Sequence, residues 1–349
     1  MSPQPPARVI TDDEIAAFRR DGVTMLTGLF EPRWIELLGA GLDDHIASPT
    51  SRARIWDRDS EGRTMFWDSM AWRDVPAYEE FVRTSPAAEI AGRMLGATAI
   101  NFFFDAVFVR SPGSQFETPW HQDEPYWSVD GHQTCTVWMP LAPVKAKNAL
   151  AFVPGSHLGG TVFDQPDFGT LNPDAKTDVD SSDFSAIAEA DIPDISADPE
   201  AYGVVSWDME PGDCVVFNSR ILHGGSGRLS PDEDLRVFTS KWLGDDVRIA
   251  FRDVGMDPDF SDIMREHGLA SGDRPGTDLL PRVWSSLNAT ASLVARKRRW
   301  PIGVPRAAGV VSAGRRPHVR WRRPDLGGAT RWIGRATCHG GPVRGEQVA

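Results

Sequence analysis

The sequence contains few cysteines and no long apolar runs. Among 349 residues there are three cysteines, Cys135, Cys214 and Cys338, too few and too scattered for a disulfide framework or a four-thiolate zinc site. The longest apolar stretches, such as residues 149–154 and 214–217, are much shorter than the roughly 18 residues of a membrane-spanning helix. We therefore expect reduced thiols and no membrane partner. The first residues, MSPQPP, do not resemble a secretory signal, so we expect a cytoplasmic protein.

Basic residues are scarce in the first part of the chain. Residues 1–284 hold 24 Lys+Arg and 47 Asp+Glu, a net charge of −23, whereas residues 285–349 hold 13 and 2, a net charge of +11. An acidic body repels nucleic-acid phosphates. Nucleic acid binding is therefore expected only through the basic tail, if at all.

The apolar pattern predicts two helices followed by strands. Thr11 and the three acidic residues after it are typical of a helix N-terminus, and a second helix is predicted from residue 32 to 46. Short runs rich in Val, Phe, Trp and Thr then predict strands. They cover residues 100–110, 134–141, 149–153, 204–207, 213–217 and 236–243. Strands without intervening helices indicate an antiparallel barrel or a jelly roll within one domain, residues 1–284.

The segment TPWHQDEPYW, residues 118–127, carries the first candidate metal ligands. On an extended strand His121 and Asp123 share one face. About a hundred residues later the segment FNSRILHGG ends an apolar run at His223. Two histidines and one carboxylate can occupy one face of an octahedral iron(II) and leave three positions open. We therefore predict that His121, Asp123 and His223 are metal ligands and the catalytic centre.

Arg236 follows His223 by 13 positions and has two interpretations. The planar guanidinium could bind the far carboxylate of a 2-oxoacid through two hydrogen bonds and would stay ionised when buried. Alternatively, Arg236 is a surface partner of the acidic residues 232–234. The spacing alone leaves both open.

Several phrases together resemble the phytanoyl-CoA dioxygenase family of iron(II)- and 2-oxoglutarate-dependent oxygenases. They are TPWHQD, TVWMPL (136–141), VPGSH (153–157), PGD (211–213) and LHG (222–224), with Arg236 beyond. The resemblance runs from about Thr11 to Trp284. It implies a double-stranded β-helix, a cupin-like jelly roll, with the N-terminal helices packed on one sheet. It also implies that His121, Asp123 and His223 hold the iron.

The resemblance further implies that Arg236 anchors the distal carboxylate of 2-oxoglutarate and that Trp138 lies beside this cosubstrate. The chain departs from the family pattern at two turns. It has Asn148-Ala149 where many members have Asn-Gly, and Gly225 where many have Ser. The interval from His223 to Arg236 is also long for the family. These departures concern the contacts to 2-oxoglutarate and leave the three metal ligands intact.

The function implied is hydroxylation of an aliphatic C–H bond of a small molecule or secondary metabolite. Iron(II) would be the cofactor. 2-Oxoglutarate and O2 would be consumed, and succinate and CO2 would be released. Asp123 argues against halogenation, because related halogenases bind a halide where this carboxylate stands. Desaturation, cyclisation and epimerisation stay open. So do two other classes: a cupin-type metalloenzyme that does not use 2-oxoglutarate, and a non-catalytic binding protein that acts through its basic tail.

Residues 160–202 form a long acidic insertion with no periodic pattern. From Asp164 to Glu200 it holds 11 acidic residues against Lys176 alone. Such an insertion is an active-site lid or a disordered loop. As a lid, its field would favour a cationic or neutral substrate over a polyanionic CoA thioester.

The tail, residues 285–349, shows neither helical nor strand periodicity. It is either a nucleic-acid or anionic-surface arm, or a disordered extension without catalytic consequence, because too few apolar residues recur to bury a core. Following the second interpretation, we expect a chain ending near Asn288 to fold and to consume 2-oxoglutarate at close to the full-length rate. Loss of solubility or of most activity would show instead that the tail binds the acidic body.

Overall fold

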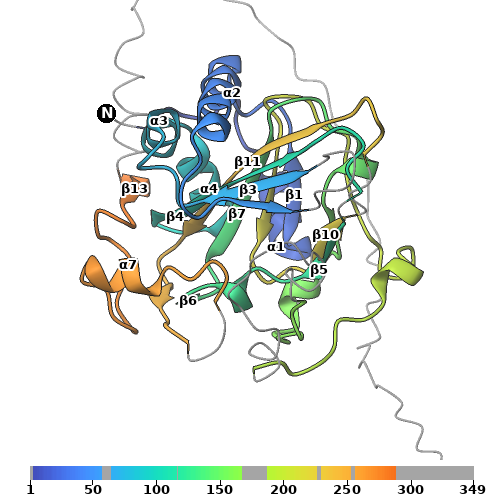
Figure 1. Cartoon of the computed structure of the whole chain (residues 1–349). Helices are drawn as coiled ribbons and strands as arrows, with labels where there is room; N and C mark the ends of the chain where they lie inside the picture. Colours follow the sequence, from blue (N-terminus) through green and yellow to red (C-terminus); the bar gives the residue numbers. More distant parts are fainter. Residues whose placement is uncertain are drawn as a thin grey trace, which may run out of the picture. The chain divides into compact units, whose positions relative to one another are not determined.

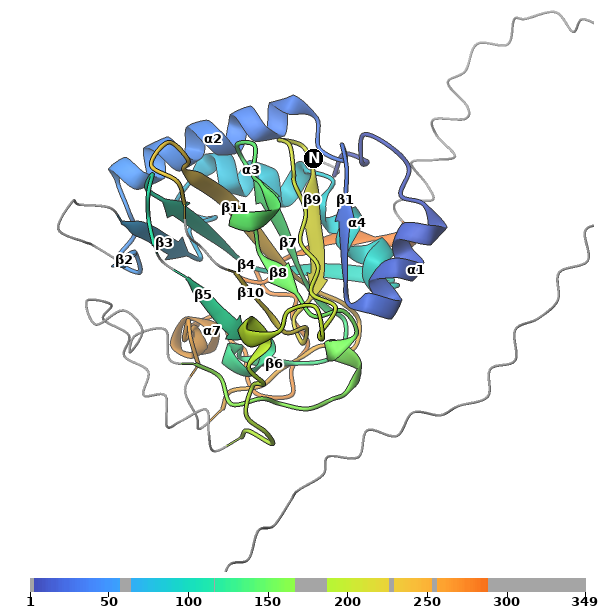
Figure 2. The same cartoon turned by 90° about the vertical axis from the view of Figure 1, so that its right-hand side faces the viewer.

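The computed structural model describes residues 3–56, 64–115, 117–166, 187–225, 229–252 and 256–287. Within these residues two antiparallel sheets face each other across a cavity (Figures 1 and 2). The larger sheet has the order β1-β9-β7-β11-β4-β3-β2, and β13 also pairs with β4. The smaller sheet has the order β5-β10-β8. This is the predicted jelly roll.

The strands of the larger sheet are β1 (Val23–Leu26), β2 (Arg54–Trp56), β3 (Met65–Ser69), β4 (Ala99–Arg110), β7 (Thr134–Pro140), β9 (Cys214–Asn218), β11 (Leu235–Leu243) and β13 (Arg282–Ser285). Those of the smaller sheet are β5 (Thr118–His121), β8 (Ala151–Phe152) and β10 (His223–Gly225). A separate short ladder joins β6 (Val129–Asp130) to β12 (Arg248–Ile249).

Both predicted helices are present. The first, α1 (Asp12–Asp21), begins with a capping box in which Thr11 and Glu14 each accept a hydrogen bond from the other's backbone N–H. The second is α2 (Pro32–Ala47). Among the described residues, three further helices were not predicted: α3 (Pro76–Thr84), α4 (Ala87–Leu95) and α7 (Ser261–Glu266). All three are short and lack a side-chain N-cap hydrogen bond, so they do not carry the strongest start signal of a helix.

Helices α2 and α3 lie on the side of the larger sheet that faces away from β5 and β10 (Figure 2). Tyr78 and Phe81 of α3 pack against Phe238 of β11, with ring centroids 4.9 and 5.1 Å apart. Such aromatic pairs add stabilisation beyond the burial of their area. The prediction of N-terminal helices packed on one sheet is therefore confirmed.

Strand β11 shows which side chains reach the interior. Leu235, Val237, Thr239 and Lys241 line the cavity between the sheets, whereas Phe238 points to the helices. Residues of β4 that pair with the cavity-facing positions face the same way, because directly paired residues share a face of the sheet. The pairs are Leu235 with Arg110, Val237 with Phe108, and Thr239 with Ala106.

Some predicted elements are corrected. Residues 204–207 do not form a strand, since only Val205 pairs, in an isolated bridge to Phe152. Of the acidic insertion, residues 167–186 lie outside the described residues, as does the tail from residue 288 onward. The lid and the tail therefore stay predictions. In the described part of the chain, no helix has the length and apolar character needed to cross a membrane.

Candidate metal centre

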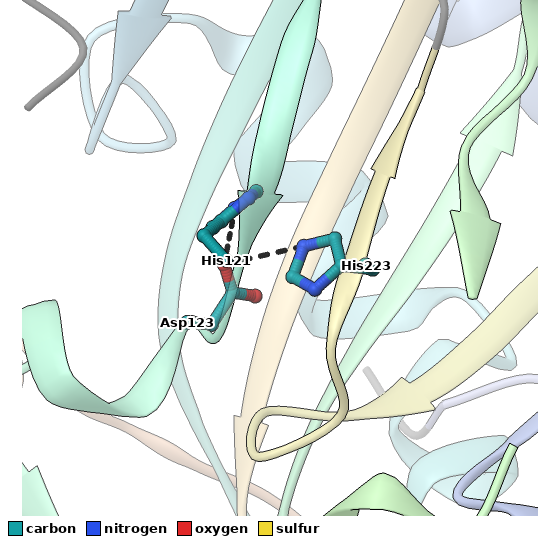
Figure 3. A group of neighbouring side chains, drawn as sticks. All are labelled: His121, Asp123 and His223. Atoms are coloured by element: carbon teal, nitrogen blue, oxygen red, sulfur yellow. Dashed lines mark ion pairs between the residues drawn. The ribbon is translucent and has the colours of Figure 1, made fainter. Parts of the chain in front are cut away.

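Two strands of the smaller sheet bring the two predicted histidines together. His121 is the last residue of β5, His223 is the first of β10, and the two are direct partners in the antiparallel ladder. Their ring centroids are 4.1 Å apart. Figure 3 shows both rings beside the Asp123 carboxylate. Pairing across the ladder thus places two imidazoles from distant parts of the sequence on one face.

Asp123 reaches the histidines through a turn, which the sequence did not predict. Strand β5 ends at His121, and Asp123 has helical backbone angles (φ −74°, ψ −42°) just before the 3₁₀ turn Glu124–Tyr126. The backbone N–H groups of Asp123 and Glu124 both donate to the carbonyl oxygen of Ser219, at 2.9 and 3.0 Å. This carbonyl fixes the turn to the segment that leads into β10.

The resulting geometry fits a metal ion bound by three protein ligands. Asp123 Oδ1 lies 3.6 Å from His121 Nε2 and 3.7 Å from His223 Nε2. One ligand atom from each of the three residues lies within 4.8 Å of the others. Two imidazole nitrogens and one carboxylate oxygen are the donor set of the facial triad that binds non-haem iron(II).

Hydrogen bonds to the backbone orient both imidazoles. His121 Nδ1 lies 2.8 Å from the carbonyl oxygen of Pro119, and His223 Nδ1 lies 3.0 Å from that of Ile221. Each Nδ1–H donates to its carbonyl, so the lone pair of each Nε2 points toward Asp123. The second carboxylate oxygen of Asp123 accepts a hydrogen bond from Thr136 Oγ1, at 3.2 Å.

The charges of the site also suit metal binding. Burial opposes the ionisation of Asp123, but the neighbouring His223 and His121 outweigh it and lower the pKa of this carboxyl to about 2. Burial, reinforced by His121, lowers the pKa of His223 to about 4. At neutral pH the site therefore presents a carboxylate and a neutral His223, the forms that coordinate metal.

The three residues lie in the wall of the cavity between the sheets, and most of the remaining wall is apolar. Tyr126 and Trp127 line this cavity as well. So does Trp138 of β7, which is 4% exposed. Its contact with a cosubstrate stays a prediction. The aromatic lining residues are Trp67, Phe104, Phe108, Tyr126, Trp127, Trp138 and Phe217.

Arg236 does not line this cavity, and its role as the anchor of 2-oxoglutarate stays a prediction. The side chain leaves the helix-facing side of β11, and its guanidinium donates to Asp43 of α2 at 2.5 Å. Neighbouring Leu235 and Val237 face the cavity, so alternation along the strand turns Arg236 away from it. The alternative of a surface ion pair was closer, although the partner is Asp43 and not one of residues 232–234.

Sequence reasoning missed three basic side chains that line the cavity: Arg54, Arg110 and Lys241. Arg54 of β2 makes a bidentate pair with Asp257, at 2.8 and 2.9 Å. Lys241 is 6% exposed, lies 4.8 Å from the ring centroid of Phe104, and has a pKa lowered by burial to about 8. Arg110 and Lys241 both fall inside predicted strands, so the sequence placed them in the sheet. Which face of the sheet each side chain takes depends on the register between strands, which the sequence did not give.

Two other histidines of the described residues, His157 and His132, lie apart from the three candidate ligands. His157 is not among the ligands; its ring packs against Gly22, where a Cβ atom would come within 2.3 Å of Nδ1. His132 is exposed. Glu124, on the far side of the turn from the metal ligands, forms a bidentate ion pair with Arg220.

The fold and the site define a jelly-roll metalloprotein. Its two histidines and one carboxylate lie where β5 ends and β10 begins. Residues 18–236 match the sequence profile of the family described as Phytanoyl-CoA dioxygenase (PhyH). The chain belongs to this family, as the motifs predicted. It is accordingly a 2-oxoglutarate-dependent dioxygenase that uses iron.

Individual relatives are distant. Ectoine dioxygenase from Sphingopyxis alaskensis is 22% identical over 240 residues, which cover 64% of this chain and 72% of that protein. The carbocyclase SnoK from nogalamycin biosynthesis superposes with a TM-score of 0.59 at 20% identity, over 81% of this chain and 100% of SnoK. The epimerase SnoN from the same biosynthesis gives a TM-score of 0.54 at 18% identity, over 78% and 98%. At such identities the solved structures confirm the fold.

Proposed function

We propose that His121, Asp123 and His223 bind iron(II) and that the enzyme hydroxylates an aliphatic C–H bond of a small molecule, with release of succinate and CO2. One observation carries this proposal. Two Nε2 atoms, oriented by backbone carbonyls, and one buried carboxylate oxygen converge at the wall of an apolar cavity. A cluster with only a structural role would gain nothing from two nitrogen lone pairs that both point at a carboxylate oxygen.

The protein contributes geometry and an environment to this reaction. His121, Asp123 and His223 would hold the iron(II) and would leave room beside it for 2-oxoglutarate and O2. When bound, iron(II) and 2-oxoglutarate supply the oxidising chemistry. Asp123 occupies the position that a halide would need, which favours hydroxylation over halogenation. The aromatic walls exclude water from the reacting C–H bond and hold an apolar part of the substrate beside the triad.

Small molecules are favoured as substrates by the relatives and by the acidic insertion. Structures of the relatives include SnoN with iron, 2-oxoglutarate and a nogalamycin compound, and ectoine dioxygenase with 2-oxoglutarate and 5-hydroxyectoine. In this chain the described ends of the acidic insertion pair with each other, Phe163 with Ala190, and Tyr126 donates to the carbonyl of Pro166 at 2.6 Å. Because the Tyr126 ring lines the cavity, the insertion leaves and rejoins the fold next to the site.

A succinate-release screen tests the proposal. Purified enzyme with Fe(II), 2-oxoglutarate and O2 is incubated with amines, amino acids, polyketide-type compounds and acyl-CoA thioesters in parallel. We expect succinate above the substrate-free background for a free small molecule, and mass spectrometry should show the gain of one oxygen atom. Product that has lost two hydrogen atoms would replace hydroxylation by desaturation or cyclisation. Turnover of acyl-CoA alone would contradict the small-molecule assignment.

A further inference from the structure

Three cationic side chains among the described residues line the cavity, and they lie at different places along its wall. The guanidinium of Arg54 is engaged at both ends by Asp257. The ammonium of Lys241 donates to Thr239 Oγ1, and Lys241 pairs across the sheet with Thr136, the residue that binds Asp123. Lys241 therefore lies at the level of the metal ligands. The third, Arg110, lies at the other end of the same strands, where its Nη2 donates to the carbonyl oxygen of Ser114 at 3.4 Å.

Arg110 is the last residue of β4 and is only 3% exposed. Its direct partner on β11 is Leu235, and both face the cavity. At this end of the smaller sheet Thr118 pairs with Gly225, and both also line the cavity. Thr118 precedes His121 by three residues, or about 10 Å of extended strand.

We infer that Arg110 binds the distal carboxylate of 2-oxoglutarate, the role that the family pattern would give to Arg236; this inference rests on the proposed function. One end of a dicarboxylate chelates the metal, and the other end needs a buried cation to replace its water. Arginine serves best, because its fork donates two hydrogen bonds to a carboxylate and it stays charged when buried. Arg236 cannot serve, because it points to Asp43 on the outer face of the sheet.

The register of the sheet explains why Arg110, and not Arg236, supplies a cation to this end of the cavity. A cation at position 235 would face the cavity, but this chain has Leu235 there and its arginine one residue later, on the wrong face. Arg110 sits directly opposite Leu235 on the neighbouring strand. The positive charge therefore reaches the same end of the cavity from β4 and not from β11.

Binding of 2-oxoglutarate, measured without turnover, tests this inference. Full-length protein is loaded with Fe(II) under anaerobic conditions and titrated with 2-oxoglutarate or with pyruvate, which has the same chelating group but no distal carboxylate. The visible charge-transfer band of the chelated 2-oxoacid gives both dissociation constants. Arg110→Gln should raise the dissociation constant of 2-oxoglutarate at least about 30-fold, which is the range for loss of one partner of a buried ion pair. Pyruvate binding should change less than about threefold.

Arg236→Gln is the matched control, and we expect it to leave both dissociation constants unchanged. The double variant Arg110→Gln/Leu235→Arg moves the cation across the ladder and should restore much of the 2-oxoglutarate affinity. Arg110→Lys keeps the charge, so it serves if the Gln variant does not fold; it should lose affinity for 2-oxoglutarate more than for pyruvate.

Three results would overturn the inference. The first is that the Arg110 variants weaken the binding of 2-oxoglutarate and of pyruvate equally. The second is that these variants bind 2-oxoglutarate as the parent does. The third is that Arg236→Gln or Lys241→Met, instead of the Arg110 variants, loses the preference for 2-oxoglutarate over pyruvate. If the parent protein binds Fe(II) and pyruvate but gains nothing from the distal carboxylate, Arg110 has no such role. If the parent gives no 2-oxoacid band at all, the proposed function fails together with this inference.

Discussion

The Asp123→Ala variant is expected to lose iron binding and 2-oxoglutarate turnover almost completely. Asp123 is the only anionic member of the triad, and its Oδ1 lies within 3.7 Å of both Nε2 atoms. Its removal leaves two neutral imidazoles and an extra open position. The loss of metal affinity should exceed the roughly 10- to 100-fold that changes in the groups around metal ligands cost. Iron content after dialysis and 2-oxoglutarate consumption measure it.

Two variants calibrate this result. Thr136→Val removes only the hydrogen bond to Asp123 Oδ2, so we expect a loss inside the 10- to 100-fold range. Asp130→Ala removes a largely exposed carboxylate that pairs with Arg252, and it should keep parental iron content. If Asp123→Ala retains the parental turnover and iron content, the assignment of Asp123 as a metal ligand is wrong.

The second large effect is expected from Glu124→Ala, which should destabilise the fold and loosen the metal site together. Glu124 is 7% exposed and forms a bidentate pair with Arg220. Its removal leaves the charge of Arg220 without its carboxylate partner. Loss of one partner of a fully buried pair costs about 3–5 kcal/mol. Because the Arg220 side chain is 27% exposed, we expect a smaller loss, about 2 kcal/mol.

The metal site should respond as well, since Glu124 directly follows Asp123 and the N–H groups of both bind the Ser219 carbonyl. Urea unfolding of the metal-free protein gives the stability change, and an Fe(II) titration gives the affinity. Glu79→Ala, which breaks an exposed pair with Arg83 on α3, is the control and should cost about 0.5 kcal/mol or less. Equal effects of the two variants would show that the Glu124 pair does not support the turn.

The sequence by itself determined the fold class, α1 and α2, and it singled out the three side chains that the structure brings together as a candidate metal site. These features depend on local signals. A capping residue, alternating apolar side chains, and a histidine two residues before an aspartate can all be read within one segment. The ordered phrases from residue 118 to 224 then placed the chain in its family, because their combination is far more specific than any one of them.

The tertiary structure decided how distant segments face one another. It turned Asp123 toward the histidines through a helical turn held by Ser219, where an extended strand was predicted. It also directed Arg236 to α2 and brought Arg110 and Lys241 into the cavity. A shift of one residue in a strand exchanges its two faces. Strand ends and register follow from packing between β4, β7 and β11, so spacing along the chain could locate Arg236 near the site but could not show which face it would take.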